Sequence, residues 1–520
     1  MKTIASLMTM LLSAVLLTTV HAAELKLAAV FADHMVLQCD KPVPVWGWAD
    51  PGGQVSVNFG GQEKQAAADA TGKWLVKLDP LKASAEPRML VAKSKGVSNE
   101  LRVADVLVGE VWLGSGQSNM AMDVSRARDF NTVKSFAQLP LIRMFKETSG
   151  AAPKPQQDAK GQWVLCAPES VGAFSATLYF FGRELYLELK VPVGLINSSV
   201  GGTPIEAWID GTAQSKMPEG KAAVDAQNKA DAALDTPQAK EQYEKQLARW
   251  KEQADQAKAA GKPAPKKPLD PQQQRARRAG AGGLFSGKIA PLVPYAIRGV
   301  LWYQGEANAN PAKAPLYQKQ LALLVNDWRA RWGGELPFAW VQLPNFKNPA
   351  GDGWMLVREA MLKTLSLPRT GMAITIDIGD PNNIHPANKQ EVGRRLSLWA
   401  LGEVYNKKVA ATSGPLPAGH EARGAGMVLT FTHCEGGLKA RDGELKGFVI
   451  AGEDRQWQPA VARVDGDKVL VSSPQVVKPV AVRYAWEVDP ACNLVNGAGL
   501  PASPFRTDDW TTPVPGKGKP

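Results

Sequence analysis

The 520-residue chain has only four cysteines, and no two of them form a C-x-x-C pair. They are Cys39, Cys166, Cys434 and Cys492. This wide spacing excludes a zinc ribbon and a thioredoxin-like redox motif. In an oxidising compartment Cys434 and Cys492 are candidates for one disulfide, and free buried thiols are the alternative.

The chain also lacks long apolar runs, because none after its first 22 residues is long enough to span a bilayer. The first 22 residues resemble a secretory signal peptide, with a basic Lys2, an apolar run over 4–20 and a small-residue cleavage site at Val20-His21-Ala22. No cysteine follows that site, so a lipoprotein anchor is not expected. We predict an exported protein, periplasmic or extracellular, without a stable membrane anchor.

A nucleic-acid-binding motif is absent too, despite a net charge of +11. Residues 216–278 contain 14 basic and 9 acidic side chains, so this one segment holds nearly half of the excess. The charge of the remaining chain is close to balanced. A nucleic-acid partner is therefore not expected.

The length of the chain predicts about two to four domains. From residue 23 to about 103, short β-type runs alternate with Gly- and Pro-containing turns, which is typical of a small β-sandwich or jelly roll. Similar runs return over 407–510 and predict a second β-rich region. The last ten residues, 511–520, are expected to form a disordered tail.

Between residues 104 and 406, apolar strand-like runs alternate with amphipathic helical segments, which predicts an α/β domain with a doubly wound parallel sheet. Predicted strands cover residues 106–113, 193–197, 298–303, 338–343 and 372–376. Predicted helices cover 174–190, 316–331, 355–365 and 388–405. Residues 216–278 interrupt this alternation and are rich in Ala, Lys, Gln and Glu, so they predict an exposed helical hairpin followed by a basic linker, Lys262–Pro268.

A candidate nucleophile follows the buried strand predicted at 106–113. The strand ends in the Gly-rich turn Gly114-Ser115-Gly116, and Ser118 comes next. A strand that enters a Gly-rich turn can hold a nucleophilic serine at a sheet edge. The turn is not the G-x-S-x-G elbow, because Met120 occupies the second Gly position. An ordinary turn serine is the alternative interpretation.

A serine nucleophile needs a base, which is usually histidine. The chain has five histidines. His21 belongs to the predicted signal peptide, and the β-rich flanks contain His34, His420 and His433. Only His385 lies in the α/β region, in a loop after the strand predicted at 372–376, where parallel sheets place their sites. His385 is the candidate base, and an ordinary loop histidine is the alternative.

Two further turns follow predicted strands. In the first, Gln304 could donate an N–H to an oxyanion and Glu306 could orient an imidazole. In the second, Gly201-Gly202 could offer a backbone N–H. Taken singly, each turn has a structural alternative, as a tight turn or a solvated loop.

Four sequence blocks together resemble the sialate O-acetylesterase family, which belongs to the SGNH/GDSL-type hydrolases. The blocks are GQSNM (116–120), SSVGGTPIEAW (198–208), WYQGEANA (302–309) and DIGDPNNIHPANKQEVGRRL (377–396). The flanking blocks FADHMVLQ (31–38) and LPASPFRT (500–507) are similar to the same family. The resemblance covers nearly the whole chain after residue 22 except the inserted segment. It implies an SGNH-hydrolase-like α/β fold and carbohydrate acetylesterase activity.

The resemblance implies that Ser118 is the nucleophile and His385 the general base. Gly201 or Gly202, Gln304 and the Ser118 N–H would form the oxyanion hole. Catalysis would proceed by acyl transfer through an acetyl-enzyme, and no metal or cofactor is required. The family's acid commonly precedes the histidine by three residues, where this sequence has Asn382. The orienting acid is therefore Asp380, Glu306 or none.

The predicted partner is an acetylated sugar. The candidate substrate-binding residues are Gln117, Asn119, Trp302 and Tyr303, and the rings of Trp302, Tyr303 and Trp354 could stack on a sugar or pack in the core. The sugar could be sialic acid or a plant cell-wall xylan or xyloglucan. A lipid esterase is disfavoured because the inserted segment lacks a strong apolar face. A non-catalytic glycan-binding protein is disfavoured because Ser118 and His385 are both present.

Overall fold

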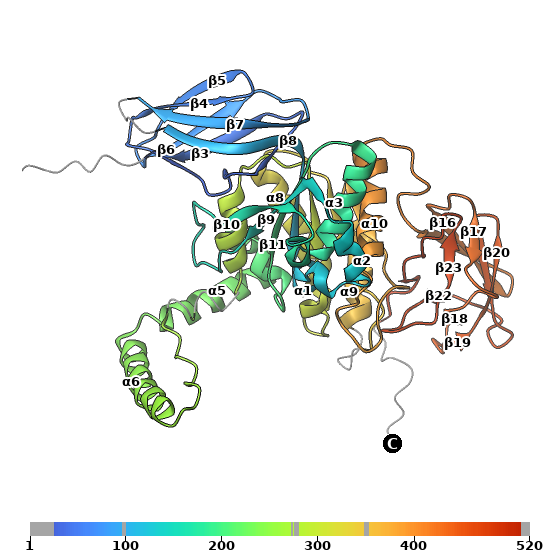
Figure 1. Ribbon diagram of the computed structural model, residues 1–520. Coiled ribbons are helices and arrows are strands. Elements are labelled where there is room, and N and C mark those ends of the chain that lie inside the picture. Colours follow the sequence, from blue (N-terminus) through green and yellow to red (C-terminus); the bar gives the residue numbers. More distant parts are fainter. Residues whose placement is uncertain (1–24, 96–99, 272–273, 275–279, 348–352, 511–520) are drawn as a thin grey trace, which may run out of the picture.

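The computed structural model describes residues 25–95, 100–271, 274, 280–347 and 353–510. The predicted signal peptide and the predicted tail lie outside these residues. Figure 1 shows a β-rich N-terminal region, a central α/β region and a β-rich C-terminal region, with a helical arm projecting from the centre. This arrangement agrees with the predicted fold class.

The centre of the molecule is a sheet with the strand order β10-β9-β11-β8-β12-β13-β14. Six of these strands run parallel, and β10 pairs antiparallel with β9. β9 and β10 are not among the strands predicted from the sequence. The strands are β8 (Glu100–Gly116), β9 (Leu139–Glu147), β10 (Gly161–Cys166), β11 (Val193–Ser199), β12 (Gly299–Tyr303), β13 (Phe338–Val341) and β14 (Thr370–Ala373).

Helices cover both faces of this sheet, as the doubly wound prediction requires. Successive side chains of a strand point to opposite faces. Val111 and Leu113 of β8 therefore pack into one core with α8 (Tyr317–Arg331) and α9 (Gly353–Thr364). Trp112 packs into the other core with α3 (Ala176–Leu189) and α10 (Lys389–Trp399). Both faces are covered, and the central strands β12 (GVLWY) and β13 (FAWV) are wholly apolar.

β8 connects the N-terminal region to the central sheet in one continuous strand. Its first half pairs antiparallel with β7 (Ser84–Ser94), and Leu107–Gly109 pair in parallel with β2 (Val36–Gln38). Its second half is the middle strand of the parallel sheet. The border predicted between residues 103 and 104 therefore lies within one strand. The remaining strands of this region are β1 (Lys26–Leu27), β3 (Val43–Trp48), β4 (Gln54–Phe59), β5 (Gln62–Ala67) and β6 (Lys73–Leu78).

The C-terminal region has its own core beside α10. Two four-stranded sheets have the orders β15-β16-β21-β20 and β19-β18-β22-β24, and β17 pairs with β23. The strands are β15 (Leu416–Arg423), β16 (Gly426–Thr432), β17 (Leu438–Ala440), β18 (Phe448–Ala451), β19 (Gln458–Pro459), β20 (Val461–Asp465), β21 (Lys468–Ser472), β22 (Ala481–Tyr484), β23 (Leu494–Asn496) and β24 (Phe505–Arg506).

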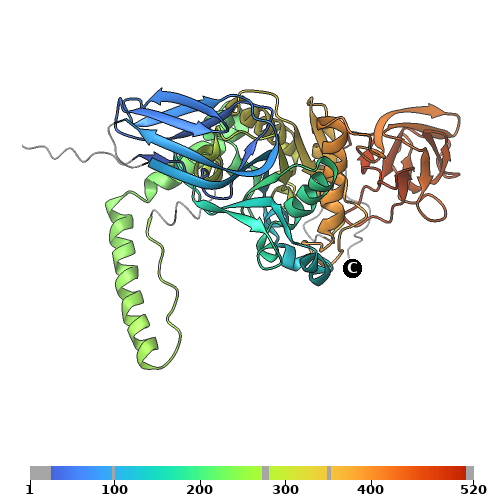
Figure 2. The ribbon, with the colours of Figure 1, turned by 45° about the horizontal axis from the view of Figure 1, so that its top comes forward.

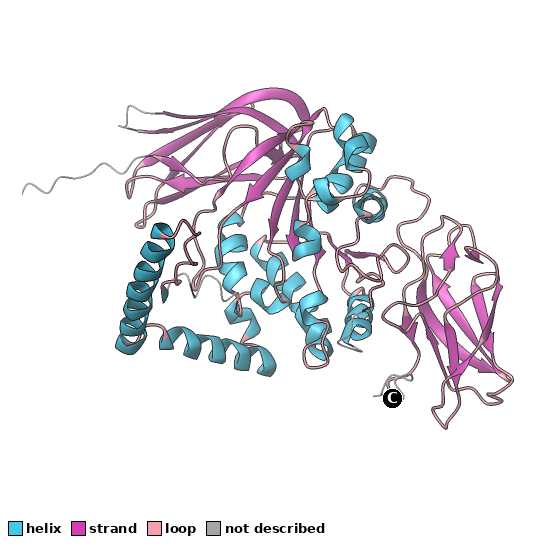
Figure 3. Cartoon of the chain, turned by 60° about the horizontal axis from the view of Figure 1, so that its bottom comes forward, coloured by secondary structure: helices cyan, strands magenta, loops and turns pink. Residues whose placement is uncertain are grey.

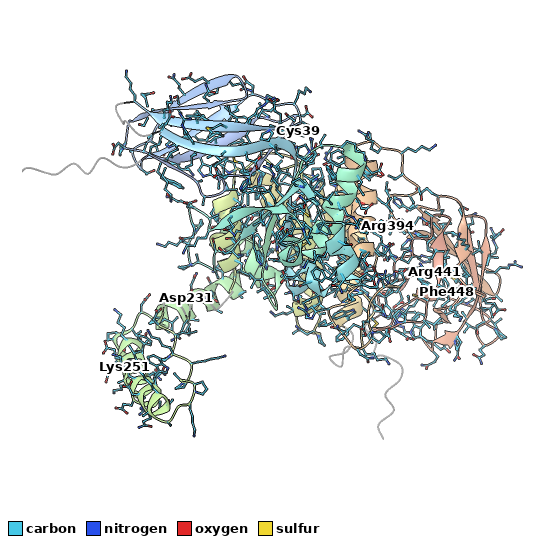
Figure 4. All side chains as sticks on the ribbon, viewed as in Figure 1. Cys39, Asp231, Lys251, Arg394, Arg441 and Phe448 are labelled. Atoms are coloured by element: carbon cyan, nitrogen blue, oxygen red, sulfur yellow. The ribbon has the colours of Figure 1, made fainter. Side chains whose placement is uncertain are left out.

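Polar contacts attach the C-terminal region to the α/β region. Arg441 lies on the side of the C-terminal region that faces Arg394 of α10 (Figure 4), and it donates to Asp377 Oδ2 at 2.8 Å. The fully buried Arg358 of α9 donates to four backbone carbonyls, two in each region. Those carbonyls belong to Leu343, Pro344, Glu487 and Val488. Asp377 lies in the loop that leads from β14 to His385, so this attachment lies close to the candidate site.

The inserted segment is helical, but its two helices do not lie side by side as in a hairpin. α5 (Pro218–Ala233) leaves the body of the molecule, and α6 (Pro237–Ala259) turns away from it (Figures 1 to 3). The returning chain instead runs along α6, where Trp250 Nε1 donates to Pro265 O at 2.7 Å. The segment Lys262–Pro268 therefore packs against α6.

All four cysteines are free thiols, so the candidate disulfide between Cys434 and Cys492 is not formed. Cys434 Sγ lies 3.5 Å from Phe431 O, and burial raises the pKa of the Cys492 thiol to about 11. Within the described ranges, no helix is long and apolar enough to span a membrane.

Candidate active site

Four loops that leave the carboxyl ends of central strands carry the candidate residues. Ser118 follows β8, Gly201 follows β11, Gln304 and Glu306 follow β12, and His385 lies in the loop after β14. Gly116, the last residue of β8, pairs with Ser199 on one side and Tyr303 on the other. The candidate loops after β11 and β12 therefore flank the Ser118 turn.

The turn before Ser118 requires glycine at position 116. Gly116 has a φ of +135°, and a Cβ placed there would lie 2.1 Å from Tyr303 O. The next residue, Gln117, donates its backbone N–H to the same carbonyl at 2.9 Å. The short helix α1 (Ser118–Ala121) begins directly after this turn, which places the Ser118 side chain at the edge of the sheet.

Ser118 Oγ lies 2.7 Å from His385 Nε2, a hydrogen-bond distance, and both residues are partly buried. Burial lowers the pKa of His385, and the positive charges of Arg126 and Lys389 lower it further. A lowered pKa favours the neutral imidazole, which can accept a proton. The pair has the geometry of a nucleophile and its general base.

Neither candidate acid contacts the imidazole of His385 through a hydrogen bond in the described part of the chain. Glu306 Oε1 instead accepts from Asn119 Nδ2 at 2.6 Å, and burial raises the pKa of the Glu306 carboxyl. Asp380 Oδ1 accepts from the backbone N–H of Asn382 at 2.9 Å. The structure therefore brings Ser118 and His385 together but gives neither Glu306 nor Asp380 the position of a triad acid.

Backbone N–H groups at the site are available for an oxyanion. A Cβ added to Gly201 would lie 3.5 Å from Ser118 Cβ, so the two residues are neighbours. Among the described residues, neither the Ser118 N–H nor the Gly201 N–H has a hydrogen-bond partner. Gly202 has a φ of +71°, which lets the loop turn away after Gly201.

The prediction that Gln304 donates to an oxyanion does not fit the structure. Gln304 is fully buried, and its Nε2 donates to Thr203 O at 3.2 Å and to Asn308 Oδ1 at 2.8 Å. Its Oε1 accepts from the Tyr317 hydroxyl at 2.9 Å. These partners occupy both the nitrogen and the oxygen of the side-chain amide. Gln304 therefore links the loops after β11 and β12 and has no N–H left for an oxyanion.

The aromatic rings proposed to stack on a sugar belong to the core. Trp302 and Tyr303 are 0% exposed and Trp354 is 1% exposed, which leaves no ring face for a ligand. Trp302 packs edge-on against Trp208 and Trp328, with centroids 6.0 and 6.1 Å apart. The physical reason is the two-sided sheet, because Trp302 and Tyr303 point from β12 into opposite cores.

Gln117 and Asn119, also predicted to bind substrate, support the site from within. Gln117 is buried, and its Oε1 accepts from the backbone N–H of Ala307 at 3.2 Å. Asn119 is fully buried and bonded to Glu306, Ile384 and Lys389. Their side chains join the loop of Ser118 to the other loops.

Two residues near the site were not predicted from the sequence. Lys389, the first residue of α10, is fully buried beside Asn119. Arg126 is exposed, lowers the pKa of His385, and has no ion-pair partner within the described segments. A lysine at a helix start and an arginine in a polar segment are ordinary surface patterns, so only the short spacing of Lys389 from His385 could have drawn attention to it.

No group of three or more His, Cys, Asp or Glu side chains in the described ranges is arranged to hold a metal ion. The chemistry available at the edge of the sheet is that of a hydroxyl, an imidazole and backbone N–H groups.

Comparison with known proteins finds carbohydrate esterases. Residues 273–401 match the family described as "Carbohydrate esterase, sialic acid-specific acetylesterase". Sialate O-acetylesterases from Homo sapiens and Mus musculus are each 29% identical to the chain; each alignment covers 92% of the chain, and 92% and 94% of those proteins, respectively. The crystal structure of a carbohydrate acetylesterase from Xanthomonas citri is similar with a TM-score of 0.79 and 37% identity, over 94% of this chain and 100% of that one.

Proposed function

The chain belongs to the sialate O-acetylesterase family of carbohydrate esterases, and we propose that it removes O-acetyl groups from sugars with Ser118 as nucleophile and His385 as general base. The 2.7 Å contact between Ser118 Oγ and His385 Nε2 carries this proposal. The membership itself makes the chain a carboxylic ester hydrolase that acts on acetylated carbohydrate.

The reaction has two steps. His385 Nε2 accepts the proton of Ser118 Oγ as that oxygen bonds to the acetyl carbonyl carbon. The tetrahedral oxyanion accepts hydrogen bonds from the N–H groups of Ser118 and Gly201. His385 then gives its proton to the departing sugar oxygen, which leaves an acetyl-Ser118. Water, deprotonated by His385, attacks the carbonyl carbon of this ester, and His385 returns the proton to Ser118 Oγ as acetate is released.

The catalytic unit is a dyad, without an acid that orients the imidazole. Glu306 accepts a hydrogen bond from Asn119, and Asp380 accepts one from the backbone of Asn382, so both carboxylates are used away from the imidazole. The loop that carries His385 is held by a different contact, in which the backbone N–H of His385 donates to the Asn383 side chain, Oδ1, at 2.9 Å.

An acidic sugar such as acetylated sialic acid is the preferred substrate. Arg126 supports this choice, because its exposed guanidinium is close enough to lower the pKa of His385 and forms no ion pair among the described residues, although the carboxylate of Asp123 interacts with it electrostatically. A guanidinium recognises a carboxylate through paired N–H donors. Neutral acetylated xylan and xyloglucan carry no such group, so they serve as the contrasting substrates.

The first 22 residues support export of the protein. Lys2, the apolar run over 4–20 and the small residues at the predicted cleavage site have the order that a secretory signal peptide requires. The exported protein would act in the periplasm or outside the cell.

The experiment that tests this function measures acetate release from 9-O-acetyl sialic acid, acetylated xylan and acetylated xyloglucan. The purified protein should release acetate, fastest from the acetylated sialic acid. Ser118→Ala and His385→Ala should each reduce the rate by on the order of 10³-fold or more while the protein remains folded. Near-normal turnover by Ser118→Ala would refute the assignment.

A further inference from the structure

The main chain on both sides of His385 is held by one buried pair of side chains, Asn119 and Lys389. Asn119 Nδ2 donates to Ile384 O at 3.0 Å, and Lys389 Nζ donates to Pro386 O at 2.8 Å. Lys389 Nζ also donates to Asn119 Oδ1 at 2.7 Å, which joins the two. His385 lies between the two carbonyls.

The same pair connects the base to the nucleophile. Asn119 is the residue next to Ser118 in α1, so its backbone moves with the nucleophile. Asn119 and Lys389 link the Ser118 turn to both carbonyls that flank His385. A shift of this pair would change the distance between Ser118 Oγ and His385 Nε2.

Burial lowers the pKa of Lys389 to about 7, and two neighbouring groups favour its charged form. Lys389 is 0% exposed, and its Nζ lies 5.3 Å from the centroid of the Tyr303 ring, within the range of a cation–π contact. The Glu306 carboxylate supplies the opposite charge nearby and accepts from Asn119 Nδ2 at 2.6 Å. Since an unpaired buried ammonium is costly, Glu306 is needed as the counter-charge of this lysine.

Resting on the proposed roles of Ser118 and His385, we propose that Lys389 is a positioning residue of the esterase. Together with Asn119 it fixes the main chain on both sides of His385, so that Nε2 faces Ser118 Oγ. This clamp of Asn119 and Lys389 orients His385, which is the task of the acid in a triad. Glu306 hydrogen-bonds Asn119 and favours the charged form of Lys389, and it does not contact the imidazole.

Two roles of Lys389 predict different kinetics. A lysine that only stabilises the fold would, when replaced, lower the melting temperature and leave the turnover of the folded enzyme unchanged. A positioning lysine changes kcat, because misplacement of a reacting group by about 1 Å can cost on the order of 10²-fold in rate. Its charge also lowers the pKa of His385, so its removal changes the pH profile.

The test uses Lys389→Met, which keeps the apolar stem and removes the ammonium. Lys41→Met is the matched control, since Lys41 is half-buried and donates to a backbone carbonyl, Ile297 O, at 2.9 Å, close to the opposite end of β12. The substrate is p-nitrophenyl acetate, which has no sugar and so leaves KM independent of sugar contacts. Each full-length variant is also measured for thermal unfolding and for kcat/KM against pH.

We expect Lys389→Met to reduce kcat by on the order of 10²-fold with KM within about twofold of the wild-type value. The acidic limb of kcat/KM should move to higher pH, because the loss of a nearby positive charge raises the pKa of His385. Lys41→Met should keep kcat within about twofold and keep the acidic limb in place.

A folded Lys389→Met enzyme with kcat near the wild-type value, or with an unmoved acidic limb, would overturn the proposal. If this variant does not fold, Lys389→Gln retains an amide donor and is measured in the same way. Failure of both to fold would also overturn it, because the lysine would then be required for stability. Ser118→Ala is measured alongside, since turnover by that variant would refute the proposed nucleophile and not the clamp.

Discussion

Ser118 Oγ and His385 Nε2 lie 2.7 Å apart, although 267 positions separate the two residues in the chain. The parallel sheet accounts for this contact, because β8 and β14 both end at the same edge. The two other loops at that edge, after β11 and β12, carry buried polar side chains that hydrogen-bond one another and the Ser118 turn. The reactive groups are therefore few, and many buried hydrogen bonds hold the loops that carry them.

The first prediction concerns the two candidate acids. Asp380→Asn should keep kcat/KM within about tenfold of the wild-type value, because its carboxylate is not hydrogen-bonded to His385. Glu306→Gln should reduce kcat/KM more than Asp380→Asn does, because it removes the opposite charge beside Lys389, but by less than the loss on the order of 10³-fold expected for a triad acid. In Glu306→Gln the new amide oxygen can still accept from Asn119. Steady-state kinetics on p-nitrophenyl acetate measure both variants. A loss of more than about 10³-fold in one of them would show that its carboxylate does orient the imidazole.

The second prediction concerns pH. Burial and nearby positive charge lower the pKa of His385 below its ordinary value of about 6.5. Since the neutral imidazole is the active form, kcat/KM should rise with pH and reach half of its plateau below pH 6.5. Arg126→Gln should move this midpoint upward. A wild-type midpoint above that value would contradict the assigned environment of His385.

The contact between Ser118 and His385 could be anticipated from the sequence for identifiable reasons. A Gly-rich turn after a buried strand marks Ser118, and His385 is the one histidine in the α/β region. Both signals are local or compositional. The structure brings together the two residues that these signals indicate.

The supporting residues could not be assigned from the sequence, because their roles depend on which face of the sheet they occupy. Trp302 and Tyr303 follow one another on β12 and enter opposite cores, although tryptophan and tyrosine are also typical sugar-stacking residues. Gln304 could equally have faced an oxyanion. Lys389 begins a helix, a place where lysine is commonly solvated. Likewise, β9 contains charged residues and did not match a buried-strand pattern, and β8 has no break at the predicted domain border.

The third prediction concerns substrate selection. Arg126→Gln should raise KM for 9-O-acetyl sialic acid by about tenfold or more, since one charge-assisted contact to the carboxylate is lost, and should leave KM for p-nitrophenyl acetate unchanged. Arg128→Gln is the control, because Arg128 is exposed on the same segment and lies near Asp129, 3.4 Å from Nε to Oδ2. Equal KM values for Arg126→Gln and the wild type on the acetylated sialic acid would exclude a role for Arg126 in recognising the sugar.

The fourth prediction concerns export. Expressed at full length in a bacterium, the protein should be recovered outside the cytoplasm with its N-terminus at Ala23, because cleavage is expected after Ala22. Mass spectrometry of the intact protein from each cell fraction measures this. A cytoplasmic protein that keeps residues 1–22 would contradict the signal-peptide assignment.

The fifth prediction concerns the acetyl-enzyme, and it tests the central claim most directly. The enzyme is mixed with an excess of p-nitrophenyl acetate, quenched in acid within the first turnover, digested, and analysed by mass spectrometry. The account predicts one acetyl group, on the peptide that contains Ser118 and located on that residue, and its absence from Ser118→Ala. An acetyl group trapped on a different side chain while the enzyme turns over, or undiminished turnover by Ser118→Ala, would contradict it.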